Sequence, residues 1–245
     1  MLNLYRQLTD YPVFAHEGSI IPLDVADLPG NGGPNPNGYE LIVVVGKDGR
    51  FCIVEDSRDD PVNAELGEEA YEERQIPITW TQAEGWLRIG PVTSDAGDGG
   101  SDYLKRYWKI RFLSCRGVEL KDITIADFEA EAGMNRSLAG GCTVIVSNVP
   151  LSKQLVIQIG QNPQLDVLDI IEPIRSIING LQCQFDIKDK LYECIEEDGL
   201  SIAARTSRLL AVGVDAEIAG PIFELLLADS RLQCEPQFQP CESKL

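Results

Sequence analysis

The stretch Arg106-Tyr107-Trp108-Lys109-Ile110-Arg111-Phe112-Leu113 decides the class of fold, because its side chains alternate in character. One face carries Tyr107, Lys109, Arg111 and Leu113, and the other carries Trp108, Ile110 and Phe112. A period of two residues is typical of a half-buried β-strand. The stretch therefore predicts a strand whose aromatic and aliphatic face lies in a hydrophobic core.

Short apolar segments with turn-forming residues between them lie on both sides of this strand. They are Val13–Ala15, Ile20–Leu23, Glu40–Val45, Phe51–Val54, Ile76–Thr81, Trp86–Ile89, Leu120–Ile125, Cys142–Val146 and Leu155–Ile159. Two pairs of segments are predicted hairpins, one closed by Gly46-Lys47-Asp48-Gly49 and the other by Ala83-Glu84-Gly85. About ten short strands with closely spaced turns predict an antiparallel β-sandwich.

From about residue 164 the apolar period becomes that of a helix. Leucine and isoleucine recur at steps of three or four at Leu165, Leu168, Ile171, Ile174 and Ile178. Three further helices are predicted around Phe185–Ile195, Ile202–Val212 and Glu217–Leu227, with Gly213 ending the middle one. The fold class expected is β-rich α+β, an antiparallel β-sandwich followed by a C-terminal helical segment and a flexible polar tail over 230–245.

The charge balance excludes several classes of partner. The chain of 245 residues has 21 Lys and Arg against 39 Asp and Glu, a net charge of −18. Such a surface repels the phosphates of nucleic acids and anionic membranes, so neither is expected as a partner. No apolar run is long enough to span a membrane. The first residues, MLNLYRQLTDYPVF, lack the apolar core of a signal peptide, which favours an intracellular location.

Catalytic patterns are weak throughout the chain. The single histidine, His16, is predicted to be a solvated turn residue, and neither a nucleophile elbow nor a phosphate-binding loop occurs. The run Glu55, Asp56, Asp59 and Asp60 could bind Ca²⁺ or act as an acid/base pair, but a solvated acidic loop is favoured. A second acidic cluster, at 65–73, is expected to be solvated as well. No catalytic residue, metal ion or cofactor is predicted.

The seven cysteines lack the paired spacing of zinc or redox sites. Cys52, Cys115 and Cys142 are predicted to be buried free thiols. Cys234 and Cys241 are expected to be free in the tail, although a loop-closing disulfide is the alternative in an oxidising compartment.

Two kinds of residue could contact carbohydrate. Trp80 and Trp86 flank the second predicted hairpin and could stack on sugar rings, although packing in the core is the favoured role. Asn135 begins the sequon Asn135-Arg136-Ser137, which accepts a glycan only if the chain is secreted.

A longer motif carries a family resemblance. The segment Tyr11-Pro12-Val13-Phe14-Ala15-His16-Glu17-Gly18-Ser19-Ile20-Ile21-Pro22-Leu23 resembles the strand–turn–strand that follows the catalytic barrel in glycoside hydrolase family 31, the α-glucosidase and α-xylosidase family. The stretch Gly49-Arg50-Phe51-Cys52-Ile53-Val54-Glu55-Asp56 is similar to a motif in the family's distal β-sandwich. The sequence departs from the family pattern at His16, where arginine is usual, and at Ser57-Arg58-Asp59-Asp60, where Asp-Asp-Gly is expected.

The resemblance implies a division of the chain. Residues 1–23 would be the end of the proximal C-terminal β-domain, 24–160 the distal β-sandwich and 164–229 a helical extension. Family members are retaining α-glycosidases with two catalytic aspartates on a TIM barrel, a domain of about 250 residues. No position here matches either aspartate, so the chain is expected to be inactive alone, as a truncated product or an incomplete chain.

Three hypotheses follow for function. The first is a non-catalytic C-terminal part of a family 31 α-glycosidase, with the barrel of the parent enzyme as partner. In that case the strands Val13–Ala15 and Ile20–Leu23 would have unpaired edges and the chain would be poorly soluble. The second is a self-standing carbohydrate-binding β-sandwich that uses Trp80 and Trp86. The third is a protein-interaction module that uses the C-terminal helices.

Overall fold

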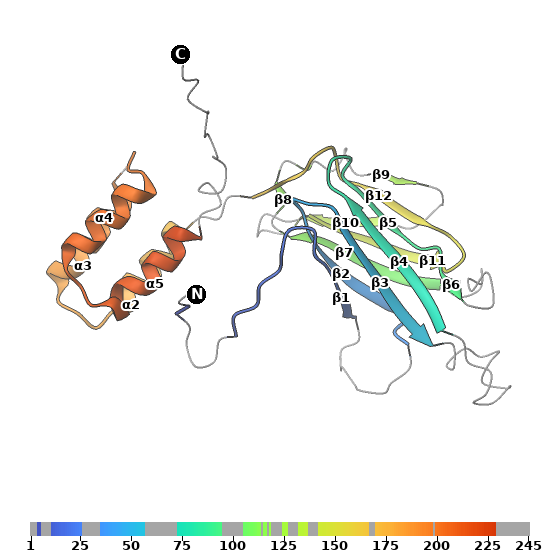
Figure 1. Ribbon diagram of the computed structural model, residues 1–245, viewed down its shortest axis with the longest axis horizontal. Coiled ribbons are helices and arrows are strands. Elements are labelled where there is room, and N and C mark those ends of the chain that lie inside the picture. The colour runs from blue at the N-terminus through green and yellow to red at the C-terminus, as the bar shows by residue number, and fades with distance from the viewer. Residues whose placement is uncertain are drawn as a thin grey trace, which may run out of the picture. The chain divides into compact units, whose positions relative to one another are not determined.

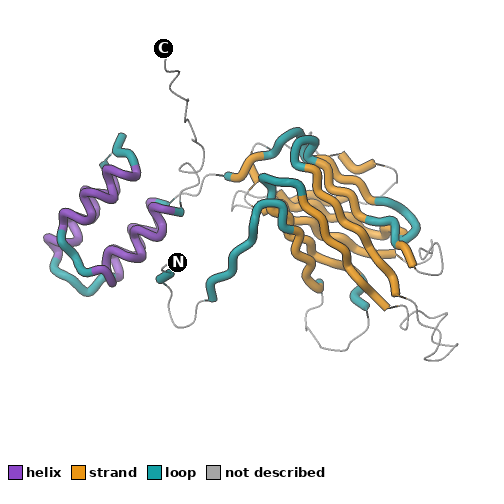
Figure 2. Tube along the Cα trace, viewed as in Figure 1, coloured by secondary structure: helices purple, strands orange, loops and turns teal. Residues whose placement is uncertain are grey.

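The chain divides into a β-rich unit and a helical unit. The computed structural model describes residues 4–5, 11–25, 35–56, 73–94, 105–113, 115–116, 118, 124–126, 132–136, 142–166, 170–197 and 199–228. The β-rich unit comprises Ala15–Asp166, and the helical unit comprises Met1–Phe14 with Val167–Leu245. Strands and helices occupy separate parts of the chain (Figure 2).

The β-rich unit contains two larger sheets and one small sheet (Figure 1). The first has the order β1 (Ile20–Asp24), β2 (Gly38–Val44), β7 (Lys105–Leu113), β11 (Cys142–Pro150) and β10 (Ala132–Arg136). The second has the order β3 (Gly49–Asp56), β4 (Glu73–Thr81), β5 (Trp86–Ile89), β12 (Leu155–Gln158) and β9 (Thr124–Ala126), with β6 (Thr93–Ser94) also paired to β4. The small sheet pairs β13 (Gln164–Leu165) with β8 (Cys115–Arg116).

Among the described strands, pairing is antiparallel with one exception, the parallel pair of β2 and β7. The expectation of a wholly antiparallel arrangement is therefore wrong at this pair. After β2 the chain forms β3 to β6 in the second sheet. It then returns to the first sheet as β7, which lies beside β2. Two neighbouring strands linked by so long a connection can run in the same direction, which a short hairpin would not allow.

The alternation in β7 confirms the predicted strand. Along Lys105–Leu113 the residues Arg106, Trp108, Ile110 and Phe112 are buried. In the parallel register Tyr39, Leu41 and Val43 of β2 lie beside Trp108, Ile110 and Phe112, so both strands turn the same kind of face inward.

The two larger sheets contribute to one hydrophobic cluster. Its largest fully buried side chains include Trp80, Trp108, Phe112, Leu41, Ile78 and Leu155. Burial of a large apolar side chain stabilises a fold by roughly 1.5–3 kcal/mol. The shared cluster is thus the main source of stability for this unit.

One predicted hairpin is confirmed and the other is wrong. β4 and β5 pair as a hairpin around Ala83-Glu84-Gly85, where Gly85 has a positive φ of 65°. The Gly46–Gly49 turn instead connects β2 to β3, which belong to different sheets. The Gly18 backbone approaches this connection closely, since a Cβ on Gly49 would lie 2.1 Å from the carbonyl oxygen of Gly18.

The N-terminal part of the unit differs from the prediction. Val13–Ala15 forms no strand, whereas Ile20–Leu23 lies in β1. β1 pairs with β2 along its length, so one of its edges is paired; as the end strand of its sheet it has no partner strand on the other edge among the described residues. The boundary expected at residue 23 falls inside β1.

Four helices follow, as predicted. They are α2 (Ile171–Gly180), α3 (Phe185–Glu196), α4 (Ile202–Val212) and α5 (Ala216–Leu227). The first begins later than the periodicity predicted, because Gln164 and Leu165 pair with β8 instead. Gly213 ends α4 in the left-handed conformation, with φ 74°, as expected for a C-terminal glycine.

The helical unit has a hydrophobic cluster of its own. Its buried members are Ile170, Ile174, Ile178, Leu191, Cys194, Ile195, Leu209, Ile222 and Leu226. The high content of isoleucine and leucine in this part of the chain is therefore explained largely by packing of the helices on one another. The N-terminal segment also packs here, since the Tyr5 amide donates to Glu224 Oε2 at 2.8 Å.

Candidate functional site

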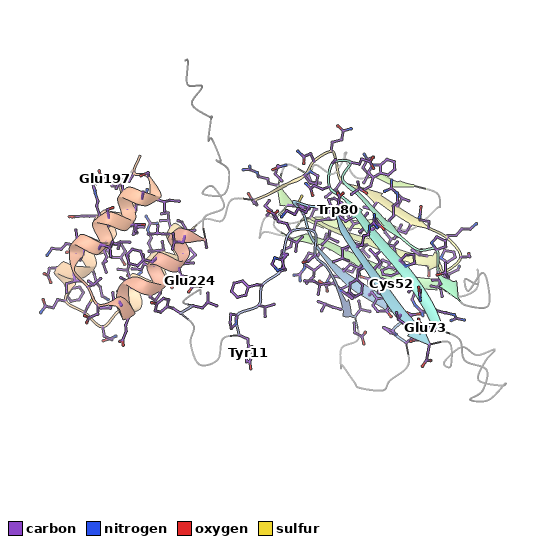
Figure 3. The ribbon with its side chains drawn as sticks, in the orientation of Figure 1. Tyr11, Cys52, Glu73, Trp80, Glu197 and Glu224 are labelled. Carbon is purple, nitrogen blue, oxygen red and sulfur yellow. The ribbon has the colours of Figure 1, made fainter. Side chains whose placement is uncertain are left out.

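The two tryptophans proposed as a sugar-stacking pair lie on opposite faces of their sheet. Trp80 is fully buried, and its ring centroid lies 5.4 Å from that of Phe112 (Figure 3). Its indole Nε1 donates to Gln82 Oε1 at 3.1 Å. Trp80 therefore has no face to offer to a ligand, and the proposed pairing with Trp86 is wrong.

Trp86 lies on the other face, with its side chain half-buried. In the β4–β5 register Trp86 is opposite Thr81, whereas Trp80 is opposite the buried Leu87. The guanidinium carbon of Arg88 lies 4.4 Å from the Trp86 ring centroid, which is within the range of a cation–π contact. Trp86 remains a residue that a ligand could reach.

Gln82 organises this end of the β-rich unit, although no sequence pattern predicts this role. The residue is 8% exposed. Its Oε1 accepts hydrogen bonds from Trp80 Nε1 and from the Gly46 amide, the latter at 2.7 Å. Its Nε2 donates to the Pro163 carbonyl oxygen at 2.6 Å. One amide side chain thus joins the end of β4, the turn after β2 and the loop after β12.

A trough with a volume of about 680 Å³ opens beside that loop. Its lining residues are Arg116, Val118, Gln158, Ile159, Gly160, Gln161, Asn162, Pro163 and Gln164. The volume falls in the range typical of small-molecule sites, roughly 300–1,000 Å³. Gln158 also lies opposite Trp86 in the β12–β5 register, so the trough borders the half-buried tryptophan.

The predicted acidic run separates into different environments. Glu55 is 3% exposed and forms an ion pair with Arg106, whose Nη2 lies 2.8 Å from Glu55 Oε2. The Tyr39 hydroxyl donates to Glu55 Oε1 at 2.7 Å. Burial and the Glu55 carboxylate raise the pKa of Tyr39 far above its usual range. Glu55 is therefore a core residue and not part of a solvated loop; Asp59 and Asp60 lie outside the described residues.

The remaining predicted residues do not converge on a site. His16 is exposed, as expected of a turn residue. Asn135 lies in β10 opposite Thr143, and Ser137 lies outside the described residues. Within the described part of the chain, no group of three or more histidine, cysteine or acidic side chains could hold a metal ion. No described helix is long and apolar enough to cross a membrane.

The cysteines confirm the prediction in part. Cys115 and Cys142 are buried free thiols, as expected, whereas Cys52 is exposed on β3. In β3 Cys52 alternates with the buried Ile53, so its side chain is on the outer face of the sheet. Burial raises the pKa of Cys115 to about 12, with the neighbouring Cys142 as a further cause. Cys234 and Cys241 lie outside the described residues.

Comparison with known proteins adds no relative to this picture. No known protein family matches the chain, and no curated protein matches it either.

Proposed function

We propose that the chain is a non-catalytic C-terminal part of a family 31 α-glycosidase. In this role the β-rich unit would be the distal β-sandwich, and its partner would be the catalytic barrel of the parent enzyme. Two sheets that share one hydrophobic cluster support the sandwich assignment. The motif over Tyr11–Leu23 supports the family assignment.

One observation carries the proposal, the exposure of the apolar segment that precedes β1. Tyr11, Val13 and Phe14 are 93%, 84% and 66% exposed, and the segment lies outside any helix or strand. Tyr11 is labelled in Figure 3. Soluble proteins rarely expose neighbouring large apolar side chains without a partner surface. In family 31 the matching segment is a strand of the domain next to the barrel, so its missing neighbours would explain the exposure.

The proposal assigns no catalysis to this chain. The two aspartates of the family lie on the barrel, and no residue of this sequence matches them. Among the described residues, the buried carboxylate of Glu55 is already bound to Arg106 and Tyr39. An acid/base role would require a carboxylate that a substrate can reach.

The direct test is hydrolysis of nitrophenyl α-glucoside and nitrophenyl α-xyloside by the purified chain. We expect no turnover above a buffer blank. Turnover that disappears in the Asp56→Asn variant would contradict the proposal and would identify an enzyme of another design. Asp56 is the suitable variant because it ends β3, next to the acidic stretch that follows.

A second test addresses the exposed segment. The paired change Val13→Ser and Phe14→Ser should reduce self-association of the chain, measured by light scattering. Val54→Ser is the matched control, because Val54 is 58% exposed but lies on β3 and is not part of the segment. A native chain that is monomeric at every concentration would show that the segment needs no partner.

A further inference from the structure

The trough beside the β12–β13 loop is lined mainly by polar residues, which form its rim. Val118, Ile159 and Pro163 are buried and form the apolar part of the lining. The polar lining residues are Arg116, Gln158, Gln161, Asn162 and Gln164. Because the apolar lining residues are buried, a ligand would meet mainly the polar side chains.

Backbone contacts fix the wall of the trough. The Ile159 amide donates to the Gly85 carbonyl oxygen at 3.0 Å, and the Asn162 amide donates to the Ala83 carbonyl oxygen at 3.1 Å. The two segments also meet closely, since a Cβ on Gly85 would lie 1.6 Å from the Gly160 carbonyl oxygen. The loop after β12 is thereby locked to the β4–β5 turn. Polar groups held in place before binding lose less conformational entropy when a ligand arrives.

The backbone of the loop is also held in an uncommon conformation. Asn162 has φ 45°, in the left-handed region that non-glycine residues seldom adopt. Its side-chain Oδ1 accepts from Gln82 Nε2 at 3.4 Å, and its backbone amide is bound to Ala83. These contacts explain how the conformation is maintained at the mouth of the trough.

The lining combines four amide side chains with one cation, Arg116. Each glutamine or asparagine amide offers both a donor and an acceptor, which is the pairing that a hydroxyl group requires. Arg116 adds a planar set of donors. None of the described lining residues is acidic, so these residues offer no carboxylate to a divalent cation. The net charge of −18 for the whole chain disfavours the approach of polyanions.

We propose that this trough binds a neutral saccharide. The hydroxyl groups of the sugar would pair with the exposed amides and with Arg116. Trp86 lies next to Gln158 at the border of the trough, where a further sugar unit would meet its half-buried ring. The site rests on this geometry and does not depend on the proposed family.

The test is an NMR titration of the isotopically labelled 245-residue chain with maltotetraose, xylotetraose and, as a charged comparison, tetragalacturonate. Sugar up to about 10 mM would reveal a site with a Kd near 1 mM. We expect saturable shifts with a neutral oligosaccharide. The paired change Arg116→Ala and Gln161→Ala should weaken that binding about tenfold or more, because hydrogen bonds to an arginine and an amide are lost.

The matched control is Gln75→Ala, which removes an exposed glutamine from β4 outside the trough lining. It should leave binding unchanged, and all variants should keep the native melting temperature. Absence of binding to both neutral sugars would overturn the proposal, as would binding of tetragalacturonate alone. Binding lost in Trp86→Ala but retained in the Arg116/Gln161 variant would also overturn it, by moving the site to the sheet face.

The outcome separates this inference from the proposed function. Saccharide binding without hydrolysis agrees with both proposals. Hydrolysis of the nitrophenyl glycosides would contradict the proposed function but would not contradict saccharide binding in the trough. Absence of binding would remove the trough as a saccharide site and leave the family proposal to its own tests.

Discussion

Replacing Glu55 with alanine removes the carboxylate that binds Arg106 and Tyr39 in the interior of the β-rich unit. Arg106 is 8% exposed, so its charge would stay buried without this partner. Breaking a buried ion pair from one side costs about 3–5 kcal/mol. We therefore expect Glu55→Ala to lower the free energy of unfolding by about 4 kcal/mol, a large share of the roughly 5–15 kcal/mol typical of a domain.

Two further variants divide this cost between its causes. Tyr39→Phe removes only the hydrogen bond to the carboxylate and should cost about 1.5–3 kcal/mol. The double change Glu55→Met with Arg106→Met removes both charges and should cost less than Glu55→Ala, because a well-packed apolar pair is often as stable as a buried ion pair.

Urea unfolding followed by tryptophan fluorescence is the appropriate assay. The three tryptophans of the chain, Trp80, Trp86 and Trp108, all lie in the β-rich unit, so the signal reports that unit alone. The control is Glu84→Ala, whose carboxylate lies 3.7 Å from Arg88 on the surface and should contribute about 0–1 kcal/mol.

The reasoning would be refuted by a loss below about 1 kcal/mol for Glu55→Ala, the level of a surface ion pair. It would equally be refuted if the double variant lost as much stability as the losses of Glu55→Met and Arg106→Met added together. Additive losses would mean that the two side chains do not interact in the folded chain.

Three other predictions concern the helical unit and the cysteines. Gly220→Ala should displace Tyr5 and speed proteolysis of the N-terminal segment, because the new Cβ would lie 2.0 Å from Tyr5 Cζ. Tyr5→Ala should relieve this clash. Equal resistance to proteolysis in all variants would contradict the contact. In the native chain iodoacetamide should modify the exposed Cys52 and leave the buried Cys115 unmodified, as mass spectrometry can show. Burial raises the pKa of Cys115 from 9.0 to about 12. Between these pH values the folded chain therefore keeps the thiol proton, whereas the unfolded chain releases it. Stability should accordingly fall as the pH rises from 9.0 towards 12, and less steeply in Cys115→Ala, as urea unfolding at each pH would show.

The elements that could be predicted from the sequence depend on local patterns. Alternation identifies β7, and apolar spacing with Gly213 identifies the helices after residue 170. The β4–β5 hairpin is closed by residues adjacent in sequence, so its turn chemistry was sufficient. In each case the residues that determine the structure lie within a few positions of one another.

The features that could not be predicted depend on distant residues. Asp48-Gly49 suits a hairpin and a connection between sheets equally well, and the Gly18 backbone that approaches Gly49 lies outside this local pattern. Glu55 resembles the acidic residues beside it, and its burial depends on Arg106, 51 positions later. No local pattern distinguishes such a residue from a solvated one.

Gln82, which supports the trough, and the exposed residues of its rim differ in how closely they are tied to the core. Trp80 is buried, so its indole N–H requires an acceptor, and Gln82 supplies one while also binding the Pro163 carbonyl oxygen. A change at Gln82 would therefore disturb the core and the trough together. Arg116 and Gln161 are exposed on the rim, so they can be replaced without removing a core contact. A loss of ligand binding in the rim variants would accordingly report recognition of the ligand, whereas the same loss in a Gln82 variant would not.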